Sequence, residues 1–276
     1  MEVYSLYSGS DGNSTYIVTE KYKMLIDVGV SMKKVEYGLL VADGSTLEDI
    51  DFIFITHAHG DHIMSLLTIH EKYPTINIFI DKSTMLETIV YFEKKRKTVK
   101  FNDDVIYNVE ETQKGNYLTI DKFPIKHDAS CFGWTIEESG GESIAFIPDN
   151  GQMSYKFSEI TQLQKPFTYY IIESNYDETL QYLDTKRDIL LKRRVLGAYG
   201  HSSNVEAIKK LVVMLETSEN TIVKGVMFNH LSKDCNSEEL ATDIHKNYLE
   251  IWGKKTITKN VVFKYARTSN VVKLSY

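Results

Sequence analysis

Three histidines and an aspartate within six residues constrain this chain more than any other feature of its sequence. The segment reads Thr56-His57-Ala58-His59-Gly60-Asp61-His62 and directly follows the apolar run Phe52-Ile53-Phe54-Ile55. A strand that ends in a loop at the start of a helix can turn several imidazoles and a carboxylate toward one point. Neutral imidazole and carboxylate together suit Zn²⁺ and similar divalent ions. The segment therefore predicts a metal site at a strand end, rather than a solvated histidine-rich turn.

Three further candidate ligands each come directly after an apolar run of strand length: His127, Asp149 and His230. One such histidine alone is more often a surface or core residue. Together with the 57–62 segment, however, they favour ligands delivered from separate strand ends to one sheet edge. One ion takes three or four protein ligands, so this number of candidates suggests two ions.

The order of β-prone and helical segments predicts an α/β (α+β) chain. Strands are expected at 3–7, 15–18, 24–27, 52–56, 76–80, 104–108, 117–120, 123–127, 133–137, 143–147, 169–173, 222–228, 256–264 and 271–276. Helices are expected at 62–73, 84–96, 178–191 and 238–252, with another from Ser203, where Glu206 completes a capping box. Strand-rich sections punctuated by helices, twice over, favour two mixed sheets packed together with helices outside.

Length and composition bound the remaining possibilities. A chain of 276 residues without an internal repeat, low-complexity segment or linker is interpreted as one domain, residues 1–276. Two cysteines, Cys131 and Cys235, are too few for a disulfide framework, and no secretory signal or membrane-length apolar stretch is found. We therefore expect a cytoplasmic protein with no membrane partner, for which a homodimer is compatible with the sequence. The net charge of −6 excludes a global basic field for nucleic acid but leaves room for a local basic groove.

Five motifs, taken together, resemble the metallo-β-lactamase superfamily over essentially the whole chain. They occur in the family's order and with typical spacing: Asp27 within Leu25-Ile26-Asp27-Val28-Gly29, the 57–62 segment, His127, Asp149 and His230. The resemblance implies an αββα sandwich, two mixed sheets flanked by helices, with a two-metal site on the edge between the sheets.

The same resemblance implies how the ligands are divided between two divalent ions, Zn²⁺ or Mn²⁺. The first ion would be bound by His57, His59 and His127. The second would be bound by Asp61, His62 and His230, and Asp149 would bridge both. Asp27 would hold the histidine loop by hydrogen bonds.

A site of this kind suits hydrolysis. Two ions about 3.5–4 Å apart hold a bridging water as hydroxide at neutral pH and neutralise charge on the oxygens of an in-line displacement. Asp149 stands where the best-known zinc lactamases have cysteine, and His59 where flavodiiron reductases have glutamate, so antibiotic hydrolysis and redox chemistry are disfavoured. The β-rich segment expected after Trp252 differs from the helical tail of glyoxalase-type thioesterases. Such a site suits phosphodiester hydrolysis, and it also suits thioester or amide hydrolysis.

Four finer motifs look like the YycJ/WalJ group, which is associated with exonuclease-type DNA phosphodiesterase activity. They are residues 8–13, 173–177, 191–194 with 200–204, and 230–236. The resemblance implies substrate contacts by Asn13, Asn150, Asn175, Tyr176, Arg193, Arg194 and Asn204. Asp61 and His201 are the expected catalytic residues. His201 lies where tRNase Z-type enzymes place a proton donor and would protonate the leaving alkoxide, unless it is only a polar residue at a helix start.

Some positions depart from the group's pattern and leave the substrate open. Tyr176 replaces a histidine, Asn150 a threonine and Ala58 a glutamate. The leading hypothesis is a phosphodiesterase acting on DNA ends, with the basic residues of 186–187 and 192–194 as phosphate contacts. The alternative is a phosphodiesterase for small 3′,5′-cyclic nucleotides, of the phage anti-defence type. A non-catalytic binding protein is a third class.

Overall fold

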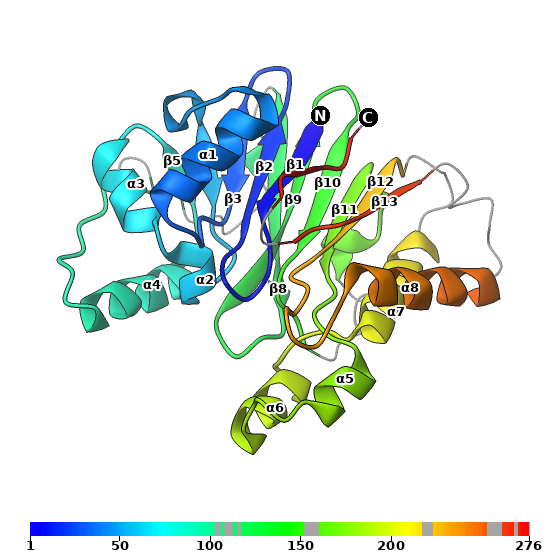
Figure 1. The fold of residues 1–276 in the computed structure, drawn as a ribbon. Helices are drawn as coiled ribbons and strands as arrows, with labels where there is room; N and C mark the ends of the chain where they lie inside the picture. Colours follow the sequence, from blue (N-terminus) through cyan, green and yellow to red (C-terminus); the bar gives the residue numbers. More distant parts are fainter. Residues whose placement is uncertain are drawn as a thin grey trace.

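Fourteen strands in the described part of the chain form two seven-stranded sheets that pack face to face (Figure 1). The computed structural model describes residues 1–102, 106–107, 113–114, 117–151, 160–216, 223–252, 261–267 and 270–275. The first sheet runs in the order β14 (Val272–Lys273), β1 (Glu2–Tyr7), β2 (Ser14–Val18), β3 (Lys23–Ile26), β4 (Phe52–Phe54), β5 (Asn77–Phe79), β6 (Ile106–Tyr107). The second runs β13 (Val262–Tyr265), β12 (Gly225–Asn229), β11 (Tyr169–Glu173), β10 (Ser143–Ile147), β9 (Cys131–Glu138), β8 (Leu118–Ile125), β7 (Gln113–Lys114). Both sheets combine parallel and antiparallel pairs, so the prediction of two mixed sheets is confirmed.

Alternation along the strands places apolar side chains on both faces of each sheet. In β10, Ile144 and Phe146 pack into the core between the sheets, whereas Ala145 and Ile147 pack outward against helices. Successive side chains of a strand point to opposite faces, so a strand that is apolar throughout is buried on both sides. The outcome is the expected αββα order of layers.

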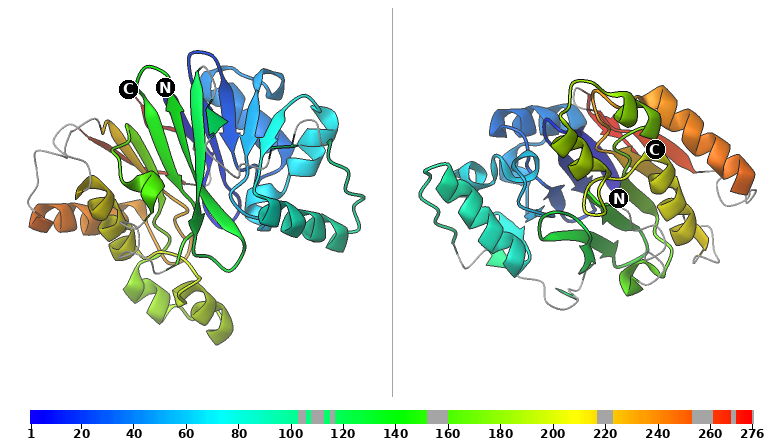
Figure 2. Two further views of the ribbon diagram at one scale, coloured as in Figure 1. Left: turned by 180° about the vertical axis from the view of Figure 1, so that it is seen from behind. Right: turned by 90° about the horizontal axis from the view of Figure 1, so that it is seen from below.

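Eight α-helices of the described residues flank this sandwich: α1 (Met32–Asp43), α2 (Gly60–Ile63), α3 (Leu66–Lys72), α4 (Lys82–Lys94), α5 (Glu178–Leu183), α6 (Ile189–Leu196), α7 (Asn204–Glu216) and α8 (Glu238–Trp252). Short 3₁₀ turns lie at Leu47–Asp49 and Thr161–Leu163. Helices α1, α3 and α4 pack on the first sheet, and α7 and α8 on the second. Helices α5 and α6 project from the end of the sandwich opposite the two chain termini (Figures 1 and 2). None of the helices that are described has both the length and the apolar character needed to cross a bilayer.

Helix α1 has no counterpart among the predicted elements. Its buried side chains are few, Val35 and Leu39 beside Gly38, while Tyr37 and Leu40 of the same helix are more than half exposed. The exposed face of the helix is thus apolar as well, which blurs the stripe at helical spacing that sequence patterns report.

Two predicted helices are each divided in the structure. The 62–73 helix breaks at Ser65, whose backbone N–H and hydroxyl both donate to the carbonyl of Val28, at 3.1 and 3.0 Å. The 178–191 helix breaks at Asp184 and restarts at Asp188, whose carboxylate caps α6 by accepting the Leu191 N–H at 2.8 Å. Side-chain caps of this kind end one helix and start the next.

Smaller differences concern the strands and one cap. The strands predicted at 117–120 and 123–127 are one strand, β8, because it pairs continuously with β9. The Ser203 hydroxyl accepts the Glu206 N–H at 3.2 Å but donates to the Glu178 carboxylate, so only half of the predicted capping box forms. Parts of the strands predicted at 104–108, 222–228, 256–264 and 271–276 lie outside the described residues.

Five strands direct their carboxyl ends to the same edge of the sandwich. Strands β10, β11 and β12 are parallel, and β8 shares the direction of β10 because both are antiparallel to β9. In the first sheet β4 ends directly before the histidine segment. In open α/β sheets, ligands bind at the edge where the carboxyl ends of strands meet.

Candidate metal centre

The first group of candidate ligands is His57, His59, His127 and Asp149, whose ligand atoms all lie within 4.8 Å of one another. His57 Nε2 and His127 Nε2 lie 3.1 and 3.3 Å from His59 Nδ1. Asp149 Oδ2 lies 3.8 Å from His57 Nε2 and 4.0 Å from His127 Nε2. Ligands about 2.1 Å from a tetrahedral ion are about 3.4 Å apart, so these spacings fit a common ion.

The second group is Asp61, His62, Asp149 and His230, and it shares Asp149 with the first. His62 Nε2 lies 3.5 Å from Asp149 Oδ2 and 3.7 Å from Asp61 Oδ2. His230 Nε2 lies 3.5 Å from Asp61 Oδ2, is buried, and has no hydrogen-bond partner among the described residues. A buried polar atom without a partner is rare in folded proteins, and an ion at this point would satisfy it.

The outer ring nitrogens of His57 and His127 already have partners. Thr56 Oγ1 donates to Asp27 Oδ2 at 2.8 Å and is therefore available to accept the His57 Nδ1 proton at 3.0 Å. His127 Nδ1 donates to the carbonyl of Gly200 at 3.0 Å. Both rings consequently turn an unprotonated Nε2 toward the site, which is the tautomer that a metal ion requires.

In His59 the two ring nitrogens have the opposite roles, with Nδ1 rather than Nε2 facing the site. Its Nε2 lies 3.2 Å from the Asp128 carboxylate, so Nδ1 carries the lone pair that faces His57 and His127. Three nitrogen lone pairs thus converge on one point, an arrangement that a cation stabilises. The donor set and its outer partners therefore fit a bound divalent ion.

Asp27 supports the histidine segment from beneath. Its Oδ1 accepts the Thr56 N–H at 2.9 Å, and its Oδ2 lies 2.7 Å from His62 Nδ1. Asp27 has a left-handed backbone with φ of 59°, an uncommon conformation for a residue other than glycine. At Gly29 a Cβ atom would lie 1.6 Å from the Asp61 carbonyl oxygen, so only glycine permits this approach.

The two groups differ in charge. Burial lowers the pKa of His57, His59 and His127, and the imidazoles around His57 add to the effect, so these rings are neutral. Against the effect of burial, the Asp149 carboxylate raises the pKa of His62, and Asp149, Asp61 and Glu173 raise the pKa of His230 to about 10. Despite its burial, Asp61 has a pKa lowered to about 2 by His62 and His230.

Glu173 completes a third group of ionisable side chains with Asp149, His201 and His230. It is fully buried at the end of β11, and its Oε1 lies 2.6 Å from His201 Nδ1 and 3.0 Å from His230 Nδ1. Against the effect of burial, the Glu173 carboxylate raises the pKa of His201. The sequence analysis assigned no role to Glu173. The signal that could have found it is its position at the end of an apolar strand, which Glu173 shares with His127, Asp149 and His230.

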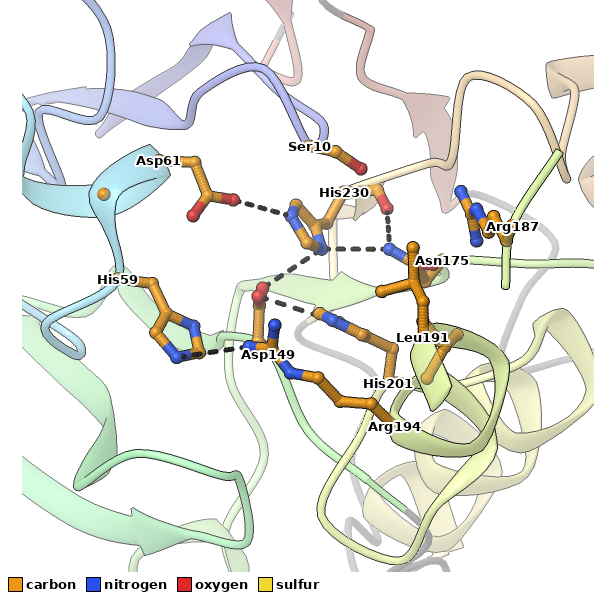
Figure 3. A pocket seen from close by; sticks show the side chains of 12 residues that line it. Ser10, His59, Asp61, Asp149, Asn175, Arg187, Leu191, Arg194, His201 and His230 are labelled. Atoms are coloured by element: carbon orange, nitrogen blue, oxygen red, sulfur yellow. Dashed lines mark hydrogen bonds and ion pairs between the residues drawn. The ribbon is translucent and has the colours of Figure 1, made fainter. Parts of the chain in front are cut away.

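A cavity of about 390 Å³ opens onto these groups (Figure 3). Its wall includes His59, Asp61, Asp149, His201 and His230 on the sheet side, and the side chains of Arg187, Leu191 and Arg194 on the α5–α6 side. Arg194 Nε donates to the Asp128 carboxylate at 2.5 Å, and Arg194 Nη2 lies 3.5 Å from His59 Nε2. The cavity therefore joins the candidate ligands to two guanidinium groups.

Only two of the seven residues expected to contact substrate line this cavity, Asn175 and Arg194. Arg193 is exposed outside it, and Asn13 is buried with its side-chain amide 3.1 Å from His62 Nε2. Asn150, Tyr176 and Asn204 are at most 3% exposed. Other side chains cover these three positions in the structure: Asn150 bonds to Ser202 and Lys210, Asn204 to Ser174 and Asn236, and Tyr176 packs with Val195 and Cys235. Contact with a substrate at these positions stays a prediction.

Comparison with known proteins shows relatives along nearly the whole chain. Residues 22–217 match the family described as the Beta-lactamase superfamily domain. The chain is 30% identical over 266 residues to the Exodeoxyribonuclease WalJ of Streptococcus pneumoniae, covering 96% of this chain and 93% of that protein. It is 27% identical over 238 residues to the Exodeoxyribonuclease YycJ of Bacillus anthracis, covering 86% and 84%.

Among solved structures, the fold is similar to that of the metallo-beta-lactamase fold protein YhfI from Bacillus subtilis. The TM-score is 0.62 at 14% identity, with 99% of this chain and 100% of that chain covered. At this identity the likeness shows the fold alone.

Proposed function

Since the chain belongs to the metallo-β-lactamase superfamily, and the two relatives compared above are named exodeoxyribonucleases, we propose that it is a dinuclear metal-dependent phosphodiesterase that acts on DNA ends. The observation that carries the proposal is the pair of ligand groups sharing Asp149, which open onto a cavity with two arginines. Anionic substrates with a phosphodiester match this combination of charges.

His57, His59, His127 and Asp149 would hold one ion, and Asp61, His62, Asp149 and His230 would hold the other. Zn²⁺ suits this His/Asp set best, and Mn²⁺ is the second choice. When bound, such a pair supplies a nucleophilic hydroxide at neutral pH and Lewis acidity toward the phosphate oxygens.

His201 is the residue placed to donate a proton to the leaving oxygen. Its Nδ1 is held by Glu173 at 2.6 Å, and the ring lines the cavity. Against the effect of burial, the carboxylate raises the pKa of His201, so the ring keeps its proton to higher pH than a free imidazole and can act as a general acid through Nε2.

Arg187 and Arg194 are the proposed phosphate contacts. Arg187 is fixed before any substrate arrives, because Nη1 donates to Gln181 Oε1 at 2.7 Å and Nη2 to Ser232 Oγ at 2.9 Å. Arg194 would bind phosphate with the guanidinium edge that Asp128 leaves open. Arg194→Gln should raise KM for DNA more than it lowers kcat.

The test is incubation of the purified protein, with Mn²⁺ or Zn²⁺, against 5′-phosphorylated single- and double-stranded DNA, RNA, and 3′,5′-cyclic nucleotides. The proposal expects mononucleotides from DNA, with an affinity that falls steeply as salt rises. Hydrolysis of cyclic nucleotides alone, with little salt dependence, would contradict the polymer substrate and support the small-nucleotide alternative. No hydrolysis of any phosphodiester by metal-loaded protein would contradict both.

A further inference from the structure

Lys210 is fully buried, and it is the one lysine in the described part of the chain to be so. It lies on the core side of α7, a helix whose other buried residues are almost all apolar, including Ala207, Leu211 and Met214. Burying an ammonium group costs several kcal/mol unless its donors are satisfied, so lysine is rarely retained at such a position for packing alone.

The three donors of Lys210 Nζ match three oxygen acceptors. Nζ donates to the carbonyl of Gly151 at 2.8 Å, to Ser202 Oγ at 2.5 Å, and to Asn150 Oδ1. An ammonium group has three protons and no acceptor, so oxygen atoms of this kind are the partners that it requires when buried.

Each of these acceptors adjoins a residue of the proposed active site. Asn150 and Gly151 directly follow Asp149, and Ser202 directly follows His201. The two turns also bond to each other, since Ser202 Oγ donates to the Asn150 carbonyl at 2.8 Å.

Glu173 holds the same two turns through their backbone. Its Oε2 accepts the N–H of Asn150 at 2.8 Å and that of Ser202 at 3.1 Å. The two turns are thus held by the buried carboxylate of Glu173 and by the buried ammonium of Lys210. The other carboxylate oxygen of Glu173 bonds to His201. The charge of Glu173 also opposes the effect of burial, which lowers the pKa of Lys210 to about 8.

We propose that Lys210 is a positioning residue that fixes Asp149 and His201 relative to each other by tying the 149–151 turn to the 200–202 turn. The inference rests on the proposed function, in which Asp149 bridges the two ions and His201 donates a proton. Lys210 itself does not line the cavity and touches no reacting atom.

The test compares Lys210→Met, which keeps an unbranched side chain one atom shorter but removes its charge and donors, with Lys209→Met. Lys209 is the preceding residue of α7; its side chain is 41% exposed and pairs with Glu206. Support residues around metal sites typically affect activity by about 10–100-fold. We expect Lys210→Met to lower kcat by about that factor with KM within about twofold of wild type, and Lys209→Met to match wild type.

A second measurement does not depend on activity. In metal-free protein, the amides of Asn150 and Ser202 should exchange with solvent faster in Lys210→Met than in Lys209→Met, while the amides of the β10 strand stay protected. Wild-type kcat together with unchanged exchange at both amides would overturn the proposal. If the wild-type protein hydrolyses no phosphodiester, the proposed function fails, and the exchange data still decide whether Lys210 holds the turns.

Should Lys210→Met fail to fold, Ser202→Ala probes the same link from its other end. It removes one acceptor of Lys210 and the bond to the Asn150 carbonyl. We expect a fall in kcat with KM and bound metal unchanged, and an activity equal to wild type would overturn the proposal.

Discussion

His59 differs from the other histidines of the first ligand group in the ring nitrogen that faces the site. Its Nδ1 lies within 3.3 Å of both His57 Nε2 and His127 Nε2, and Asp128 holds its Nε2. A single ring thus joins two ligands that come from different sheets. Loss of the His59 ring removes one of the three nitrogen lone pairs that face the proposed ion. It also removes the contact by which Asp128 orients that ring.

We therefore expect His59→Ala to lose metal and to lower phosphodiesterase activity by at least about 100-fold. The measurement is metal content by elemental analysis alongside turnover at saturating substrate. His70→Gln is the matched control, because His70 is a buried histidine that bonds the Asn102 N–H away from the site. Full activity in His59→Ala would contradict the two-metal site.

The pair of Glu173 and His201 leads to a second prediction for single residues. His201→Asn should lower kcat by about 100-fold or more while leaving metal content unchanged, because it removes the proton donor but no proposed ligand. Glu173→Gln should act in the same direction, since a neutral amide no longer stabilises the protonated ring. Loss of metal from His201→Asn would instead make His201 a ligand.

At the scale of elements, the α5–α6 segment forms the basic side of the cavity. Helix α6 begins at a side-chain cap, in which the Asp188 carboxylate accepts the N–H of Leu191, and it carries Arg194 one helical turn further on. Caps of this kind contribute about 1 kcal/mol to helix stability. Because α6 is short, the order of its first turn decides how well the cavity wall is held.

Asp188→Ala should therefore raise KM for DNA several-fold while kcat and metal content stay close to wild type. Asp188→Ser is the matched variant, because serine also caps helices, and it should restore KM. An equal loss of kcat in both variants would show that α6 acts in the chemistry rather than in binding.

The elements also show which parts of the site can be predicted from sequence. The clustering of the candidate ligands is predictable, because the 57–62 segment, His127, Asp149 and His230 each follow an apolar run that becomes a buried strand. Lys210 cannot be found this way, because a lysine in an amphipathic helix is normally assigned to the polar face. Its burial depends on acceptors supplied by Asn150 and Ser202, which lie 60 and 8 residues away in the chain.

At the scale of the whole molecule, stability and pH are linked through a buried histidine, His245, that does not line the cavity. His245 is 1% exposed on α8, where its ring lies 3.9 Å from that of Phe228 and 3.1 Å from the Tyr265 hydroxyl. Burial lowers the pKa of His245 to about 3. The native state therefore keeps this ring neutral, whereas the unfolded chain protonates it near pH 6.5.

The stability from His245 is fully present above about pH 6.5 and is lost as the pH falls toward 3, at about 1 kcal/mol per pH unit. We expect His245→Gln to be less stable than wild type at pH 7.5 but to lose less of its remaining stability on acidification to pH 5.5. Urea unfolding of the metal-free proteins at both pH values measures this. Identical losses in the two proteins would contradict the assigned direction.

The arrangement of layers was also predictable, for the same reason that the ligands were. Runs such as 52–55 and 144–147 are apolar at every position, which requires cover on both faces of the sheet. The burial of Asn150, Tyr176 and Asn204 was not predictable, because they sit beside candidate site residues in sequence but are covered by side chains from other elements. Adjacency in the chain predicts which turn a residue occupies, and only packing decides which way it faces.

Metal titration of the metal-free protein, followed by nucleotide release from 5′-phosphorylated DNA, tests the central claim most directly. The shared Asp149 predicts that activity appears as the sites fill and reaches its maximum at two ions per chain. Full activity at one ion per chain, or activity that does not depend on added metal, would contradict a dinuclear phosphodiesterase.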